Sequence, residues 1–230
     1  MISMEYGILY GVSIGPGDPE LITLKALRTM EKCPVIAVPR TGGTKTLALE
    51  IARQAMDLNG KEILYLDHRM VRDTDTLQAQ YRENAATAME YLKQGKNVAL
   101  LNLGDVSVYS TYCYIAEEVK KAGFPCEMIP GVTSFCACAA LLGQSLTEAT
   151  LPLSIFPGSY TNLENALDTP GGKVLMKSTK ALPELRTAIA ERGLEKKTAV
   201  VSDCGLPSQS IHKITDEDIQ SYFSTILIRP

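Results

Sequence analysis

The chain has 230 residues, of which 45% are hydrophobic and 21% are charged, and its 23 Lys and Arg against 26 Asp and Glu give a formal net charge of −3. This length fits one large domain or two modest ones, and no apolar run approaches the roughly 18 residues of a membrane helix, so we expect a soluble protein with no membrane contact. The mildly acidic charge argues against nucleic acid as a partner.

The first half of the sequence alternates apolar strands with amphipathic helices. The opening apolar run predicts a strand over residues 6–14, and helical spacing of leucines predicts a helix over 20–33. The same patterns predict, in chain order, a strand at 35–38, a helix at 46–56, a strand at 62–66, a helix at 74–95, a strand at 97–103, a helix at 110–122 and a strand at 126–129. Nearly all-apolar strands alternating with helices are typical of a parallel sheet that helices cover on both faces.

The second half has a different pattern, with more strands than helices. It predicts a helix of small residues at 135–142, strands at 153–156, 172–176, 198–202 and 225–228, and a helix at 182–193. We therefore expect two domains, residues 1–125 and 126–230.

Six cysteines are scattered without the paired CxxC spacing of a zinc or redox site, so we expect most of them to be small buried apolar side chains, and we expect no metal site. The N-terminus reads as a strand, and it lacks the basic segment and long apolar stretch of an export signal. The expected location is the cytoplasm.

Four glycine-containing loops follow predicted strands, at 15–18, 104–106, 130–134 and 204–207. In open α/β sheets, ligands bind at the carboxyl ends of strands, so these loops are the candidate site. Gly15 and Gly17 form half of a dinucleotide fingerprint, but Glu20 stands where the third glycine belongs.

A serine hydrolase is the alternative chemistry. Gly11-Val-Ser13-Ile-Gly15 matches the nucleophile-elbow string, and Asp203 and His212 follow in the order that such an enzyme needs. An elbow serine sits on a sharp turn, whereas Ser13 lies inside the apolar run, which disfavours this reading.

Three strings taken together resemble the tetrapyrrole methylase family: residues 10–26, which begin Tyr10-Gly-Val-Ser-Ile-Gly-Pro-Gly-Asp18, then Leu103-Gly-Asp105, then Met128-Ile-Pro-Gly-Val-Thr-Ser134. The resemblance spans nearly the whole chain and implies two α/β domains, with the active site in the cleft between them, and a homodimer. The fold it implies differs from the common Rossmann-like methyltransferase fold.

Residues 104–111, Gly-Asp-Val-Ser-Val-Tyr-Ser-Thr, resemble the branch of this family that methylates carbon 20. The resemblance thus implies transfer of a methyl group from S-adenosylmethionine to precorrin-2 or cobalt-factor II in cobalamin biosynthesis, with S-adenosylhomocysteine as product. Methylation of another position of a corrin precursor, or of uroporphyrinogen III, is the nearest alternative. A non-catalytic adenosyl-sensing module is a further one.

Site residues follow from the same resemblance. The cofactor contacts that it implies are Pro16, Leu103, Gly104, Asp105, Val108, Tyr109, Thr133, Ser134, Met176 and Gly205. The implied substrate contacts are Gly15, Gly17, Asp18, Met70, Arg72 and Asp73. The 67–73 loop departs from the family, because His68-Arg69 replaces the usual Phe-Pro before Met70.

Several of these residues have a structural reading beside the functional one. The Asp105 carboxylate either offsets the sulfonium charge and accepts hydrogen bonds, or serves as a turn residue. Asp18 either caps the next helix or faces the substrate, and the Thr133 and Ser134 hydroxyls either cap a helix or hold a ligand.

The implied reaction is attack of an electron-rich ring carbon on the methyl group, followed by loss of a proton from that carbon. Alignment of the two reactants matters most in such a step. The catalytic residue stays unassigned, since His68, Tyr109, Asp18 and water are all available as proton acceptor. Substrate carboxylates need cations, for which Arg40, Arg69, Arg72 and Lys177 are the candidates.

Overall fold

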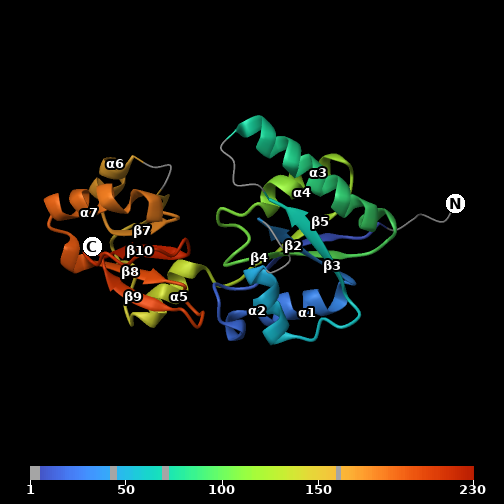
Figure 1. Ribbon diagram of the computed structural model, residues 1–230, viewed down its shortest axis with the longest axis horizontal. Helices are drawn as coiled ribbons and strands as arrows, with labels where there is room; N and C mark the ends of the chain where they lie inside the picture. The colour runs from blue at the N-terminus through green and yellow to red at the C-terminus, as the bar shows by residue number, and fades with distance from the viewer. Residues whose placement is uncertain (1–5, 42–45, 69–72, 159–161) are drawn as a thin grey trace. The chain divides into compact units, whose positions relative to one another are not determined.

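The structure is a computed structural model that describes residues 6–41, 46–68, 73–158 and 162–230 (Figure 1). The chain divides into two compact units, Met1–Thr133 and Ser134–Pro230. Each unit contains one five-stranded sheet. Among the described residues, no helix has the length and apolar character needed to cross a bilayer.

The sheet of the first unit is parallel throughout, as predicted. It consists of β1 (Leu9–Ser13), β2 (Val35–Arg40), β3 (Glu62–Asp67), β4 (Val98–Asn102) and β5 (Cys126–Ile129), in the order β3-β2-β4-β1-β5. The central strands β1 and β4 are almost entirely buried, as expected for strands with helices on both faces.

Helices cover both faces of this sheet (Figure 1). The longest, α3 (Thr74–Lys93), packs beside α4 (Tyr112–Lys121), and apolar side chains of both join those of β1, β2 and β4 in one core. The other face carries α1 (Leu24–Lys32) and α2 (Leu47–Ala55). The first unit is therefore a three-layered α/β domain.

The predicted helix at 20–33 is divided in two. A short 3-10 helix, η1 (Pro19–Leu21), comes first, and its N-terminal amide at Glu20 donates to the Asp18 carboxylate over 2.8 Å. The chain then becomes extended, and α1 starts afresh with the Thr23 hydroxyl accepting from the Ala26 amide. The break is explained by two capping residues, Asp18 and Thr23, each of which accepts a hydrogen bond from an amide at the start of its own helix.

The unit boundary differs from the predicted one. The strand β5 pairs in parallel with β1, with Leu9 opposite Cys126 and Val12 opposite Ile129. It therefore completes the first sheet, whereas the boundary after residue 125 assigned it to the second domain. The residues of β5 belong to the first sheet through this pairing, although β5 is an edge strand in which Glu127 and Met128 are exposed.

The second unit is built on a mixed sheet. Its strands are β6 (Leu153–Pro157), β7 (Gly172–Met176), β8 (Thr198–Ser202), β9 (Ser210–Lys213) and β10 (Ser224–Ile228), in the order β6-β7-β10-β8-β9. Only β6 and β7 pair in parallel, and β10 runs antiparallel between β7 and β8. The edge strand β9 was not predicted from the sequence.

Among the described residues of the second unit, three α-helices accompany this sheet. The predicted helices correspond to α5 (Ser134–Leu141) and α7 (Leu182–Glu191), whereas the short α6 (Leu163–Asp168) was not predicted. Side chains of α6 and α7 share a core with β7, β8 and β10. Two 3-10 turns, η2 (Thr179–Ala181) and η3 (Glu195–Lys197), precede α7 and β8.

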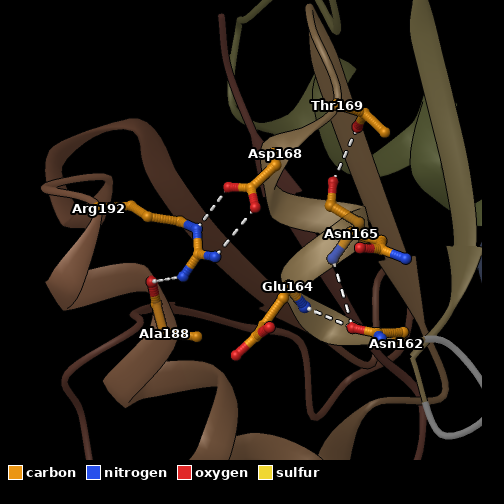
Figure 2. A network of polar contacts seen from close by, with 8 residues as sticks. Asn162, Glu164, Asn165, Asp168, Thr169, Ala188 and Arg192 are labelled. Atoms are coloured by element: carbon orange, nitrogen blue, oxygen red, sulfur yellow. Dashed lines mark hydrogen bonds and ion pairs between the residues drawn. The ribbon is translucent and has the colours of Figure 1, made fainter.

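Polar contacts fix α6 at both ends (Figure 2). The Asn162 side chain caps its start by accepting from the Glu164 and Asn165 amides. At its end, Asp168 accepts two hydrogen bonds from the Arg192 guanidinium, over 2.7 and 3.1 Å. This ion pair lowers the pKa of Asp168 and joins α6 to the end of α7.

Candidate functional site

Three loops leave the carboxyl edge of the first sheet side by side. They follow β1, β4 and β5, which are neighbours in the order β4-β1-β5. Because all three strands are parallel, their carboxyl ends reach the same edge. The glycine loops at 15–18 and 104–106, together with residues 130–133 of the third loop, are thus brought together within the first unit.

The loops after β1 and β4 are joined by their backbones. The Gly104 amide donates to the Gly15 carbonyl over 2.7 Å, which forms an isolated antiparallel bridge between the two glycines. Both have positive φ values of 73°, a backbone conformation that residues other than glycine rarely adopt. The two glycines therefore let two loops meet closely at the end of the sheet.

The Asp105 side chain ties the loop after β4 to the loop after β5. Its Oδ2 accepts from the Gly131 amide over 2.7 Å, and its Oδ1 accepts from the Ser107 amide over 2.8 Å and from the Ser107 hydroxyl. The side chain is buried, with the residue only 8% exposed. The structure thus shows the Asp105 carboxylate as a hydrogen-bond acceptor, and the donors are groups of the protein itself.

These contacts keep Asp105 ionised. Burial raises the pKa of its carboxyl, but the hydrogen bonds from Ser107 and Gly131 lower it by more, so that the pKa lies below the ordinary value. Asp105 is thus a fixed negative charge just beneath the edge of the sheet.

Ser13 binds the loop after β4 through its hydroxyl and is not an elbow nucleophile. It is the last residue of β1, is fully buried, and its Oγ accepts from the Val106 amide over 2.8 Å. A Cβ added to Gly131 would overlap the Cβ of Ser13. The hydroxyl is therefore occupied and shielded, which contradicts the hydrolase reading.

Asp203 and His212, the other two residues of the hydrolase alternative, have partners other than Ser13. Asp203 accepts hydrogen bonds from the Ser208 and Ser221 hydroxyls. His212 contacts the Ser210 hydroxyl at 2.8 Å through Nε2 and the Asp218 carboxylate at 3.4 Å through Nδ1.

Several other predicted residues of the first unit lie in the loops after β1 and β4. Gly15, Pro16 and Gly17 are buried, and Asp18 uses its carboxylate as the cap of η1. After β4, Leu103 and Val108 are half-buried, whereas Tyr109 is exposed and has a positive φ of 50°. A tyrosine in this conformation carries local strain of about 1–3 kcal/mol, which is common at ligand sites.

Thr133 and Ser134 stand at the boundary between the units. Ser134 is the first residue of α5. The Thr133 Oγ1 is buried and has no hydrogen-bond partner among the described residues, so it does not cap that helix. A buried hydroxyl without a partner costs free energy, which makes it a candidate to bind a ligand.

The second unit brings its own predicted residues to one edge of its sheet. Met176 ends β7 opposite Thr225, and Thr225 also lies opposite Val201 near the end of β8. Gly205 follows β8 and donates its amide to Gln209 over 2.8 Å. Lys177, directly after Met176, has a positive φ of 58°, and burial lowers the pKa of its ammonium group.

The divergent loop after β3 is described only in part. Met70 and Arg72 lie outside the described residues, as does Arg69. Asp73 caps α3, accepting from the Thr76 amide over 2.8 Å. Of the other candidates, Arg40 pairs with Asp67, and His68 Nδ1 contacts the Gln80 amide nitrogen at 3.0 Å.

One group of possible metal ligands was missed in the sequence. Within the described ranges, atoms of His212, Asp216 and Asp218 lie within 4.8 Å of one another. The Asp216 carboxylate already accepts from the Lys213 amide over 2.8 Å. The spacing of these residues has no recognised metal-site pattern, which is why the sequence did not indicate it.

Comparison with known proteins gives this geometry its family context. Residues 8–220 match the family model of the tetrapyrrole (corrin/porphyrin) methylases. A Methanocaldococcus jannaschii protein named as a probable cobalt-precorrin-2 C(20)-methyltransferase is 34% identical over 96% of this chain and 95% of its own. The cobalt-precorrin-2 C(20)-methyltransferase of Salmonella typhimurium is 31% identical over 96% of each chain.

The fold is also found in solved structures. The uroporphyrin-III C-methyltransferase of Thermus thermophilus, in complex with S-adenosylhomocysteine, superposes with a TM-score of 0.71. It is 22% identical and covers 96% of this chain and 97% of its own. With the model match over most of the sequence, the chain belongs to the tetrapyrrole methylase family.

Proposed function

We propose that the protein transfers the methyl group of S-adenosylmethionine to carbon 20 of precorrin-2 or cobalt-factor II in cobalamin biosynthesis. The observation that carries the proposal is the joining of three glycine loops at one sheet edge by Gly15, Gly104, Asp105 and Gly131. Relatives whose names specify carbon 20 support the position of methylation. The Thermus protein in complex with S-adenosylhomocysteine supports the donor.

The residues of this chain fit an adenosyl donor. The buried Thr133 hydroxyl has no partner among the described residues, so a ligand with many polar atoms can bond to it. The exposed Tyr109 offers such a ligand a second contact. The ionised Asp105 adds a negative potential that favours a sulfonium cation in the adjoining loops. S-adenosylmethionine supplies an electrophilic methyl group on that sulfur.

In this proposal the protein acts chiefly by positioning. The predicted donor contacts are in the loops after β1, β4 and β5 and at Met176 and Gly205, and the predicted substrate contacts are Gly15, Gly17, Asp18, Met70, Arg72 and Asp73. Alignment in near-attack geometry contributes up to about 7–11 kcal/mol in well-oriented systems. Carbon 20 then forms its bond to the methyl carbon as the bond to sulfur breaks, and a proton leaves carbon 20.

The second part of the proposal is that the protein is a cytoplasmic homodimer, which the family resemblance implies. Light scattering of the purified protein tests the oligomer, with twice the 25.0 kDa chain mass as the expected value.

A methyl-transfer assay tests the activity. Purified protein is incubated anaerobically with ¹³C-methyl S-adenosylmethionine and, in separate reactions, with precorrin-2 and cobalt-factor II. We expect one labelled methyl group at carbon 20 by NMR. Label at another carbon supports the alternative within the family, and donor binding without transfer to either macrocycle overturns the enzymatic proposal.

A further inference from the structure

Three side chains that can ligate a metal lie together at the edge of the second sheet. His212 lies in the edge strand β9, and Asp216 and Asp218 follow in the segment that leads to β10. A potential ligand atom of each residue lies within 4.8 Å of those of the other two. Imidazole nitrogen and carboxylate oxygen are both ligands that Zn²⁺ accepts in proteins. None of the three residues is a predicted donor or substrate contact, so this cluster is independent of the proposed function.

The sheet directs the His212 side chain. His212 lies opposite Val200 of β8 in an antiparallel pair, so both side chains lie on the face that packs against α6 and α7. Ile211 points to the other face and is 53% exposed, whereas the His212 side chain is only 12% exposed. The protein around the imidazole therefore limits how the ring can turn.

The segment that carries the two carboxylates is fixed to the second unit. Ile214 and Ile219, which flank this segment, are buried in the core that they share with α7. The Arg186 guanidinium of α7 donates to the Ile214 carbonyl over 2.8 Å and to the Asp216 carbonyl. An ion that binds Asp216 and Asp218 thus meets a segment that is already ordered, which lowers the entropic cost of binding.

Protein contacts also orient the ligand atoms. The His212 Nε2 lies 2.8 Å from the Ser210 hydroxyl oxygen, and a histidine that binds a metal commonly donates its other ring N–H to such a partner. With that proton on Nε2, the Nδ1 lone pair lies on the side of Asp218. The Asp216 Oδ2 accepts from the Lys213 amide over 2.8 Å, which leaves its other oxygen for an ion.

One distance favours a metal site over a simple ion pair. The His212 Nδ1 and the Asp218 Oδ1 are 3.4 Å apart. A hydrogen bond between a charged nitrogen and a carboxylate is shorter, about 2.7–2.9 Å. Two ligands that each lie about 2.0–2.2 Å from a tetrahedral ion are about 3.3–3.6 Å apart. The observed separation therefore fits two ligands of one ion better than a direct hydrogen bond.

We propose that His212, Asp216 and Asp218 bind one Zn²⁺ ion. The ligands are the His212 Nδ1 and one oxygen of each carboxylate, and water completes the tetrahedral coordination. The two carboxylates balance the charge of the ion. The bound ion joins the edge strand β9 to the segment that leads to β10.

NMR of the two histidine side chains tests the site. The chain contains His68 and His212, whose imidazole nitrogens are followed by ¹⁵N labelling while the metal-free, reduced full chain is titrated with Zn²⁺. We expect the Nδ1 signal of His212 to shift with a stoichiometry of one ion per chain, while the His68 signals stay unchanged. The readout is on imidazoles, so Zn²⁺ on cysteine thiolates does not produce it. No shift at His212, or coordination through its Nε2, overturns the proposal.

Variants test the two carboxylates and the partner of the ring. Asp216→Asn and Asp218→Asn should each weaken Zn²⁺ binding at His212 at least about tenfold, and Ser210→Ala should weaken it about 10–100-fold by releasing the ring. Glu217→Gln is the matched control, because it removes the same charge from an exposed residue between the two aspartates. It should keep wild-type affinity. If Glu217→Gln weakens binding as much as the aspartate variants do, or if those variants bind Zn²⁺ normally, the three-residue site is overturned.

Discussion

The Asp105 carboxylate and the Gly131 amide are joined by a hydrogen bond of 2.7 Å across the end of β1. The strands that lead to these two residues, β4 and β5, are not neighbours, because β1 lies between them. A single side chain thus connects two loops that the sheet hydrogen bonds do not join. The predictions below follow from this connection and from the residues packed around it.

Asp105→Ala should destabilise the protein by about 1–3 kcal/mol, because it leaves donors on Gly131 and Ser107 without their acceptor. Urea unfolding measures the change. Glu83→Ala, which removes an exposed helical carboxylate, is the control and should stay within about 0.5 kcal/mol of wild type. Equal effects of the two substitutions would contradict the role given to Asp105.

The contribution of Asp105 should depend on pH in the acid range. Its pKa is lower in the folded protein than in the unfolded chain, so the stabilisation is complete above the unfolded value of about 4 and is lost as the pH falls through the folded value. The stability difference between wild type and Asp105→Asn should be constant above about pH 5 and shrink below about pH 4. A difference that grows on acidification contradicts the sign.

Gly131→Ala should lower both stability and donor affinity, because the new methyl group overlaps Ser13 beneath the loops. Overpacking of this kind typically costs about 1–3 kcal/mol. Gly123→Ala is the matched control, since Gly123 has a positive φ of 87° but open space around it. That variant should lose stability through backbone strain and keep wild-type affinity for S-adenosylmethionine in calorimetry.

Ser13→Ala should destabilise the protein by about 1–3 kcal/mol, since the buried Val106 amide loses its acceptor. Thermal unfolding measures this loss. A fluorophosphonate probe should leave wild-type Ser13 unlabelled in the same preparation. Labelling at Ser13, with loss of ester turnover in the variant, would restore the hydrolase alternative.

Thr133→Val should separate binding from folding. The Thr133 hydroxyl has no partner among the described residues, so its removal should leave stability unchanged or slightly higher. Loss of one hydrogen bond to the donor should weaken S-adenosylmethionine by roughly tenfold. Thr87→Val, whose hydroxyl bonds within α3, should keep wild-type affinity. A Thr133→Val protein that binds normally but unfolds more easily contradicts the prediction.

Most of the fold could be predicted because the pattern of apolar residues in the sequence follows which faces of the strands and helices are buried. The strands β1, β2 and β4 are apolar runs because both of their faces are covered, and that is the pattern from which the parallel sheet was predicted. The short helix α6 has fewer than two turns, too few for an apolar pattern to repeat, and it depends on Asp168 and Arg192, which are far apart in sequence. Such a tertiary contact leaves no local signal.

The candidate site was predictable in position but not in its contacts. Glycines after strands located Gly15, Gly104 and Gly131 correctly at one edge of the first sheet. The sequence left Asp105 with two readings, because its partner Gly131 comes from another loop. Cys138 and Cys204 were expected to be buried, and both are.

The first sheet takes all five of its strands from one continuous segment that ends at Ile129, and β5 is its last strand in sequence and one of its two edge strands in space. During synthesis, every hydrogen-bonding partner of this sheet has therefore been translated before α5 begins. Once residue 131 has left the ribosome, Asp105 can close the loops around it, and the nascent chain needs nothing from the second unit to do so.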